Sequence, residues 1–267
     1  MPEGAFGAMR RLIGAQPASG SALLDALPRP RIAGRVYAVG DVHGRADLLK
    51  RLLGRIYDDA RRAPPDTPLS LILLGDYIDR GEDSKGVLEL CSRLRAEAPV
   101  DEVVFIRGNH EAALLSFLRD PAYGEQWLAW GGVETLASYG VAAPWERARE
   151  KDYEGLRDDL SAAMGAHATL LASQTTSMWR TGNIFFCHAA IDPDAPITAQ
   201  PDKALMWGDS RFMHRGGPEG MVVVHGHTVT EQPDIGRNRI GVDTGAYLSG
   251  VLSAVVIDAN GFRFLAS

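Results

Sequence analysis

The chain has 267 residues, of which 45% are hydrophobic and 23% are charged, and 28 Lys and Arg stand against 34 Asp and Glu for a formal net charge of −6. This composition is typical of a globular protein and excludes one that is disordered or collagen-like over most of its length. The acidic balance argues against general binding of nucleic acid, and no apolar run approaches the ~18 residues of a membrane span.

The first segment, residues 1–30, is rich in Gly, Ala, Ser and Pro, which is typical of a weakly ordered region. We therefore expect a flexible N-terminal arm there and a single domain over residues 31–267, because α/β folds of ~250 residues often form one unit. The two cysteines, Cys91 and Cys187, are too few for a disulfide scaffold. They indicate a reducing compartment, so we predict a cytoplasmic protein.

After the arm, a short apolar strand, a Gly-rich polar turn and a helix follow one another three times. The predicted strands are 35–40, 69–75 and 100–106, and the predicted helices are 46–60, 84–96 and a third that runs towards residue 118. Because Gly-bounded apolar runs alternate with helices, the pattern predicts an α/β fold with a largely parallel sheet that is buried on both faces.

Residues 121–177 interrupt this rhythm with tryptophans, Gly-Gly and Tyr-Gly pairs and a charged run. We interpret them as a helical, cap-like insertion over the site, whose tryptophans either pack its own core or stack on a base. Beyond it, short apolar runs with Gly, Asn and Pro turns predict hairpins and a second sheet packed on the first. These runs are 183–187, 221–224, 239–242, 251–257 and 262–265.

Polar side chains gather in the turns where strands end, which is where open α/β sheets bind ligands. They are Asp41, His43, Asp76, Asp79, Asn109, His110, His188, His225 and His227. Helix capping explains single Asp and Asn residues but not imidazoles beside carboxylates. Oxygen and imidazole donors without thiolates suit Mn, Fe, Zn, Co or Ni, and two such ions about 3.5–4 Å apart activate a shared water and clamp a phosphoryl oxygen. The pattern predicts phosphoester hydrolysis at a dinuclear site, with Asp76 as the natural bridge.

Five segments in this order resemble the successive signatures of the calcineurin-like metallophosphoesterases. They are Gly40-Asp41-Val42-His43-Gly44, Gly75-Asp76-Tyr77-Ile78-Asp79-Arg80-Gly81, Arg107-Gly108-Asn109-His110-Glu111, Cys187-His188-Ala189 and His225-Gly226-His227-Thr228. The Asp-Arg-Gly and Gly-Asn-His-Glu forms resemble the phosphoprotein phosphatase branch, and residues 127–132 and 138–140 are similar to segments of bacterial and phage Ser/Thr phosphatases. The resemblance implies a sandwich of two mixed β-sheets flanked by helices.

The resemblance also implies a role for each matching residue. The first ion would be held by Asp41, His43 and Asp76, and the second by Asp76, Asn109, His188 and His227. His110 would give a proton to the leaving alkoxide, with Asp79 orienting its ring, and a histidine is suited to this near pH 7. Arg80 and Arg107 would hold phosphate oxygens with their planar guanidinium groups.

Four further positions need separate treatment. His225 precedes Gly-His-Thr at a place where the family is usually apolar, and we interpret it as a residue of the substrate pocket or a support for a ligand. Asp192 and Asp209 stand where relatives often carry Arg. Either Arg211 reaches the phosphate from a shifted loop, or the substrate carries less negative charge than a phosphomonoester dianion.

Three functions fit these observations to different degrees. The first is a serine/threonine protein phosphatase with a metal-bridging water as nucleophile, and the second is a hydrolase of nucleotide anhydrides, such as a symmetrical dinucleoside tetraphosphatase or an RNA cap-removing enzyme. A non-catalytic scaffold would have lost ligands, and no ligand position is substituted. We therefore predict a metal-dependent phosphatase that uses two divalent ions, with Mn²⁺ as the expected metal and a phosphorylated protein or nucleotide as substrate.

Overall fold

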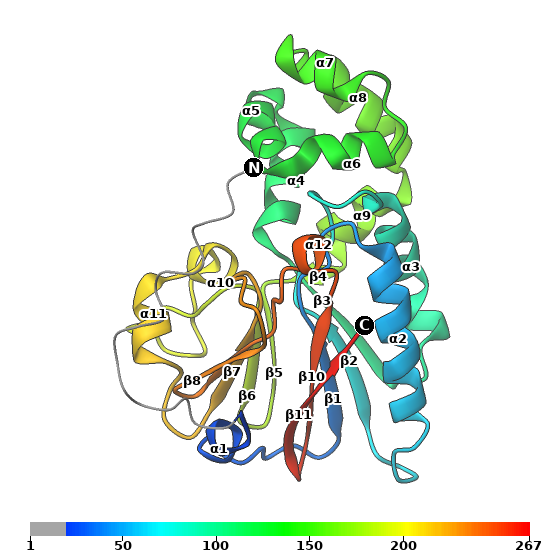
Figure 1. The fold of residues 1–267 in the computed structure, drawn as a ribbon. Helices are drawn as coiled ribbons and strands as arrows, with labels where there is room; N and C mark the ends of the chain where they lie inside the picture. The colour runs from blue at the N-terminus through cyan, green and yellow to red at the C-terminus, as the bar shows by residue number, and fades with distance from the viewer. Residues whose placement is uncertain (1–19) are drawn as a thin grey trace.

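The computed structural model describes residues 20–267. Two β-sheets pack face to face with helices on their outer faces (Figure 1), and the strand orders are β11-β10-β1-β2-β3-β4 and β5-β6-β7-β9-β8. The first sheet consists of β1 (Arg35–Val39), β2 (Leu69–Leu73), β3 (Glu102–Ile106), β4 (Thr175–Thr176), β10 (Ser253–Asp258) and β11 (Gly261–Ala266). The second consists of β5 (Met178–Thr181), β6 (Ile184–Cys187), β7 (Val222–His225), β8 (Asp234–Gly236) and β9 (Arg239–Gly241). The prediction of two mixed sheets flanked by helices is confirmed.

The three repeated units form the parallel part of the first sheet. β1 pairs with β2, β2 with β3 and β3 with β4, all in parallel, and the first three strands are followed by α2 (Ala46–Ala60), α3 (Ser84–Glu97) and α4 (Asn109–Arg119). The last two strands differ from the expectation, because β10 pairs antiparallel with β1 and the β10–β11 hairpin extends the first sheet rather than the second.

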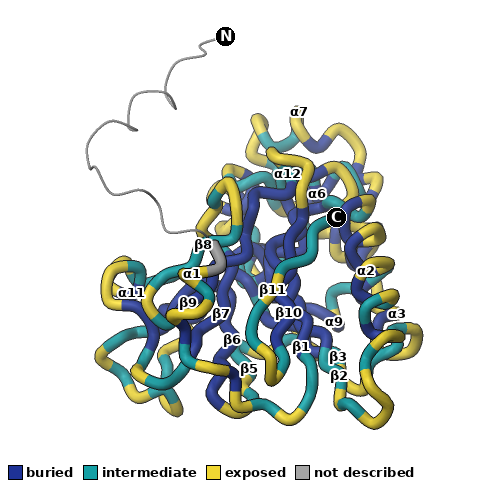
Figure 2. The backbone as a smooth tube through the Cα atoms, turned by 60° about the horizontal axis from the view of Figure 1, so that its bottom comes forward, coloured by how far each residue is buried: buried dark blue, intermediate teal, exposed yellow. Residues whose placement is uncertain are grey.

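Side chains alternate along β1 between two cores, as the pleat of a strand requires. Val36 and Ala38 face the second sheet, whereas Tyr37 and Val39 face α2 and α3. The strands therefore lie in the buried centre of the molecule and the exposed backbone lies at its rim (Figure 2). Burial on both faces fixes the register of the sheet and with it the positions of the turns at the strand ends.

The segment predicted as an insertion, residues 121–177, consists of short helices and turns from Pro121 to Ser173, contains β4 near its end and is followed directly by β5. Its elements are η1 (Pro121–Tyr123), α5 (Gly124–Trp127), a π-helical turn η2 (Leu128–Gly132), α6 (Val133–Ser138), α7 (Pro144–Arg149), α8 (Tyr153–Met164) and α9 (Ala166–Ser173). Three short helices follow later in the chain, namely α10 (Asp202–Trp207), α11 (Ser210–Arg215) and α12 (Ala246–Ser249). Figure 1 shows α5 and α6 beyond the upper ends of the strands.

The end of the predicted N-terminal arm is packed on the domain, which corrects the expectation for residues 20–30. Gly20–Asp25 forms α1, Leu27 is buried in the core between the sheets, and the Asn183 side-chain amide donates to the Arg29 carbonyl. The remainder of the predicted arm, residues 1–19, lies outside the described residues. In residues 20–267 no helix combines the length and apolar character needed to cross a bilayer.

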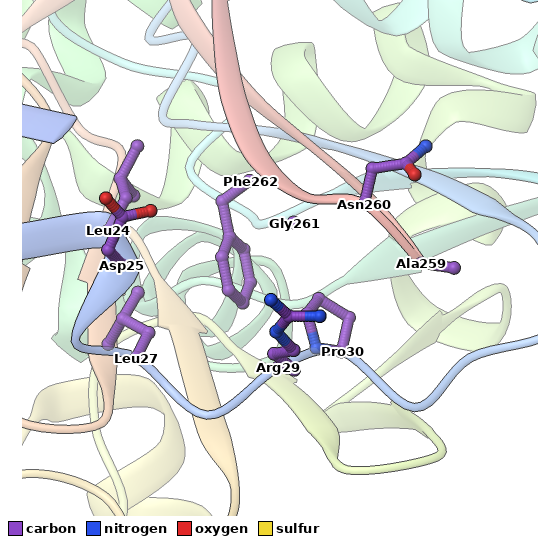
Figure 3. Close-up of a pocket in the computed structure, with 9 residues that line it drawn as sticks. All are labelled: Leu24, Asp25, Leu27, Arg29, Pro30, Ala259, Asn260, Gly261 and Phe262. Carbon is purple, nitrogen blue, oxygen red and sulfur yellow. The ribbon is translucent and has the colours of Figure 1, made fainter.

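A pocket of about 540 Å³ lies between α1 and the β10–β11 turn (Figure 3). It is at the amino end of β1, since Val36 pairs with Ile257 next to this turn. Its lining includes Asp25 and Arg29 and none of the histidines singled out from the sequence. The site chemistry is at the opposite end of the strands.

Candidate metal centre and active site

The turns that follow β1, β2, β3, β6 and β7 converge around one carboxylate, Asp76. His43 Nε2 lies 3.4 Å from Asp76 Oδ2, and His188 Nε2 lies 3.4 Å from Asp76 Oδ1. Two groups of donor atoms that could each hold an ion share this carboxylate, namely His43, Asp76 and His110, and Asp76, His188 and His227. The two oxygens of Asp76 thus face different imidazoles, which is the geometry of a bridging ligand.

The other expected ligands complete the cluster. Asn109 Oδ1 lies 3.0 Å from both His188 Nε2 and His227 Nδ1, and these two ring nitrogens are 3.2 Å apart. Asp41 lies beside them, because its Oδ2 accepts the His227 backbone N–H at 2.9 Å. All six residues predicted as metal ligands are brought together.

The backbone of these turns is held in an uncommon conformation. His43, Asp76, Asp79, Arg80 and His227 all have positive φ, between 43° and 70°, a region that costs side-chain-bearing residues of order 1–3 kcal/mol each. Backbone hydrogen bonds hold the first two turns together, since the N–H groups of Val42 and His43 both donate to the Asp76 carbonyl. Such strain at several neighbouring positions is typical of functional sites.

Two glycines allow the turns to approach so closely. A Cβ at Gly108 would lie 2.1 Å from Asp76 Oδ1, and one at Gly75 would lie 2.6 Å from the Gly108 nitrogen. Gly75 also has a φ of +105°, which other residues rarely adopt. The glycines that flank the predicted ligands are therefore required by the packing of the turns.

Hydrogen bonds fix the tautomers of the buried histidines. His43 Nδ1–H donates to the Ile78 carbonyl at 2.8 Å and His188 Nδ1–H donates to the Leu74 carbonyl at 2.9 Å, so in each ring Nε2 carries the lone pair. Burial lowers the pKa of His43 to about 3 and that of His227 to about 4. These rings are neutral near pH 7, which is the form that coordinates metals.

A further observation, apart from the identity of the side chains, indicates that the cluster could hold divalent cations. Asp41 Oδ1 is buried and has no hydrogen-bond partner among the described residues. Burial and the charges of Asp243 and Asp76 raise the pKa of Asp41 well above its usual range. A cation would satisfy the orphaned oxygen and the concentrated negative charge together, and oxygen with imidazole donors suits borderline divalent ions.

His110 and Asp79 form the expected pair. His110 Nδ1–H donates to Asp79 Oδ2 at 2.7 Å, which leaves Nε2 directed at the cluster, 3.8 Å from Asp76 Oδ2. Burial alone lowers the pKa of His110, but the charges of Asp76 and Asp79 outweigh it and the net shift is upward. A ring that retains its proton beside the metal cluster can act as an acid.

Arg80 lies against the cluster, as predicted. Its Nη1 is 3.0 Å from His43 Nε2, and its guanidinium carbon stacks 4.9 Å from the centre of the Tyr247 ring. Among the described residues it forms no ion pair with a carboxylate. Its charge is available to a phosphoryl group.

Arg107 is placed differently from the expectation. Its Nη2 donates to the carbonyls of Leu171 and Ala172, and its Nε donates to Thr175 Oγ1. The guanidinium caps the C-terminal end of α9, where helix carbonyls lack partners. The structure therefore does not bring Arg107 into the phosphate-binding position.

Arg211 and His225 are also corrected. Arg211 is exposed and bonded to Asp192, Asp194 and Asp209, so its charge is already compensated. The His225 ring packs 5.4 Å from the Phe212 ring, and its buried Nε2 has no partner among the described residues. Among the described residues, neither side chain forms a hydrogen bond or ion pair with a residue of the cluster.

Sequence reasoning missed several contributors to the site. Glu111 is fully buried and accepts the backbone N–H groups of Asp76, Tyr77 and Gly108, which joins the second and third turns. Burial and the charge of Asp76 raise its pKa to about 8. Its place in the Gly-Asn-His-Glu segment was the available signal, whereas Tyr247, which stacks on Arg80, was not predicted.

The arrangement defines a class of protein, a hydrolase whose reaction centre is a buried cluster of oxygen and imidazole donors at the strand ends of a two-sheet fold. A family model described as calcineurin-like phosphoesterase matches residues 34–247. The chain therefore belongs to the calcineurin-like phosphoesterase family, and the prediction of a metal-dependent phosphatase is confirmed at this level.

Two curated relatives cover most of the chain. Bis(5'-nucleosyl)-tetraphosphatase PrpE (asymmetrical) of Anoxybacillus flavithermus is 26% identical over 237 residues, or 81% of this chain and 88% of the relative. Serine/threonine-protein phosphatase 2 of Salmonella typhimurium is 27% identical over 228 residues, or 82% and 90%. The relatives thus represent both of the substrate classes expected from the sequence.

Solved structures share the fold. A putative diadenosine tetraphosphatase has a TM-score of 0.54 and 21% identity and covers 90% of this chain and 97% of its own. A cold-active protein-tyrosine phosphatase of a psychrophilic Shewanella species has a TM-score of 0.58 and 16% identity and covers 90% and 80%. At these identities the similarity establishes the fold only. The substrate has to be inferred from the residues of the site.

Proposed function

We propose that the protein removes phosphate from phosphoserine or phosphothreonine in proteins. The observation that carries this choice is the guanidinium of Arg80 beside the cluster, the single one available there within residues 20–267, since Arg107 and Arg211 are engaged elsewhere. One planar guanidinium group can donate two parallel hydrogen bonds to the oxygens of one phosphoryl group. A chain of four phosphates would call for further cations.

The charge at the rim supports the same choice. A Cβ at Gly208 would lie 3.9 Å from His227 Nε2, so Asp209 and its partners adjoin the site. Asp192, Asp194 and Asp209 outnumber Arg211 and Arg215, with which they pair. The resulting excess of negative charge disfavours a polyphosphate chain.

Each residue near the cluster has a proposed role. Asp41, His43 and Asp76 would hold one divalent ion, and Asp76, Asn109, His188 and His227 the other. When bound, these ions would supply positive charge for phosphoryl oxygens and would lower the pKa of a water molecule. Arg80 orients the phosphoryl group, and His110 Nε2 gives its proton to the leaving oxygen while Asp79 holds the ring. Mn²⁺ as the metal and the cytoplasm as the compartment belong to the same proposal, the second supported by two unpaired, buried cysteines.

Hydrolysis of dinucleoside polyphosphates is the second candidate, because aromatic side chains lie on the His110 side of the site. Trp130 is 6.3 Å from the His110 ring and 5.3 Å from the Trp207 ring, and Trp207 is 39% exposed. These faces would stack on a nucleobase. The PrpE relative supports this candidate.

Steady-state kinetics of the Mn²⁺-loaded protein will separate the two. We expect kcat/KM for a phosphoserine peptide to exceed that for diadenosine tetraphosphate by about 10-fold or more, equivalent to about 1.4 kcal/mol of transition-state binding. The reverse preference, lost on replacing Trp207 by Ala, would transfer the assignment to the nucleotide. Bound metal can be removed with a chelator and Mn²⁺, Fe²⁺, Zn²⁺, Co²⁺ or Ni²⁺ added back separately. The kcat/KM restored by each ion then ranks the metals.

A further inference from the structure

We propose that Trp127 and Thr135, both from the helical insertion, are positioning residues for the Asp79–His110 pair. The proposal rests on the roles given above to His110 and Asp79. It assigns to the insertion a part in proton delivery rather than only in covering the site.

The evidence is a closed set of hydrogen bonds around the Asp79 carboxylate. Trp127 Nε1–H donates to Asp79 Oδ2 at 2.9 Å, beside the 2.7 Å bond from His110 Nδ1–H to the same oxygen. Thr135 Oγ1–H donates to Asp79 Oδ1 at 2.6 Å. Both carboxylate oxygens are thereby occupied, and one is shared between the indole and the catalytic imidazole.

The backbone of Asp79 is held by the same group. Its N–H lies 3.0 Å from Thr135 Oγ1 and 3.1 Å from Ser84 Oγ, and these two hydroxyls are 3.0 Å apart. Asp79, Trp127, Thr135 and Ser84 are all fully buried. Neutral donors in a buried site orient a carboxylate without adding a competing charge.

The insertion is built to present these donors. Trp127 ends α5 and stacks on Phe117 of α4, with ring centres 4.8 Å apart, and α4 begins at Asn109 and His110. The π-helical turn that separates Trp127 from Thr135 contains Gly131 at a φ of +101°, whose carbonyl accepts the Arg80 N–H. One segment therefore fixes the proton donor and the backbone of the phosphate-binding arginine.

These contacts matter in one step of the reaction. The water oxygen bonds to phosphorus, the P–O ester bond breaks, and its electron pair stays on the leaving oxygen, which takes the proton from His110 Nε2. A freely rotating Asp79 would misdirect that proton. The loss should be large for strongly basic leaving groups and small for those that depart without protonation.

The test compares phenyl phosphate with p-nitrophenyl phosphate in Trp127→Phe and Thr135→Val variants. Trp127→Phe keeps most of the ring but removes the N–H, and Thr135→Val removes the hydroxyl. We expect kcat for phenyl phosphate to fall about 10- to 100-fold, part of the 10²–10⁴ that general acid–base catalysis contributes. The p-nitrophenyl ester should lose less than about threefold, with KM unchanged for both.

Two controls accompany these variants. Thr135→Ser restores the hydroxyl and should recover the phenyl phosphate rate, and Trp145→Phe alters a tryptophan of the insertion that is 44% exposed and should change neither rate. If Trp127→Phe does not fold, the Thr135→Val and Thr135→Ser pair decides. Equal losses on both substrates, or none, would overturn the inference alone, whereas a metal-loaded wild-type protein that is inactive on both esters would overturn the proposed function as well.

Discussion

The turns that carry the candidate metal ligands and the long side chains around them differ in how far local sequence determines their positions. Asp41, His43 and Asp76 hold their donor atoms close to a backbone that the sheet fixes, and they converge. Arg107 follows β3 directly but reaches back to α9, and Arg211 turns to neighbouring aspartates. Short side chains at strand ends inherit the geometry of the sheet, whereas long ones take their partners from whatever the tertiary structure places within reach.

Replacing Asp76 by Asn should have the largest effect, because a neutral amide cannot bridge two cations. We expect kcat/KM to fall by more than the ~100-fold that loss of an outer-sphere partner costs. Bound metal, measured by elemental analysis, should fall as well. Asp66→Asn is the matched control, since Asp66 also has a positive φ of 61° but is exposed, and an Asp76→Asn protein with full metal content and activity would refute the bridge.

Substitutions of Arg80 and Arg107 should differ from each other in their effect on kcat/KM, and the larger of the two effects should be smaller than that of Asp76→Asn. Arg80→Ala should lower kcat/KM about 10- to 100-fold, because a hydrogen bond to a charged group contributes about 1.5–3 kcal/mol. Arg107→Ala should leave kcat/KM within about threefold of wild type but lower the thermal midpoint by about 2–4 °C for each kcal/mol of lost capping. A larger catalytic loss in Arg107→Ala than in Arg80→Ala would show that Arg107 swings to the phosphate in the enzyme–substrate complex.

The smallest effect is expected at His225. Its imidazole is buried beside Phe212 with Nε2 unpaired among the described residues, and burial lowers its pKa to about 4. Replacement by Leu, which has a similar volume, removes an unsatisfied polar atom and should leave the thermal midpoint unchanged or raise it. Phosphatase rates should stay within about threefold, and a 10-fold loss would restore the interpretation of His225 as a pocket residue.

Much of the fold was predictable because its signals are local. Continuous apolar runs and Gly-rich turns located β1, β2 and β3 within a residue or two of their bounds. The place of β10 and β11 was not predictable, since an apolar hairpin can extend either sheet. Pairing with β1 depends on contacts between residues more than 200 positions apart, such as Val36 with Ile257.

The site divides in the same way. The resemblance implied the six candidate ligand residues, and their places at strand ends predicted that they would meet, but the hydrogen bonds to Asp79 were not predicted. Trp127 was expected to be a core residue, and it is buried in the structure. Its indole N–H meets Asp79 only because the insertion folds over this turn. Hydrogen bonds between segments that are distant in the sequence produce no local or periodic pattern from which they could be predicted.

The left-handed backbone at His43, Asp76, Asp79, Arg80 and His227 also bears on how the protein can change over time. Non-glycine residues with a positive φ lower the stability of the fold, so a sequence selected only for stability would avoid them here. Activity and stability therefore place opposite demands on these turns. A laboratory selection that rewards heat resistance alone should therefore accumulate substitutions at these positions first and yield sturdier proteins without a metal centre.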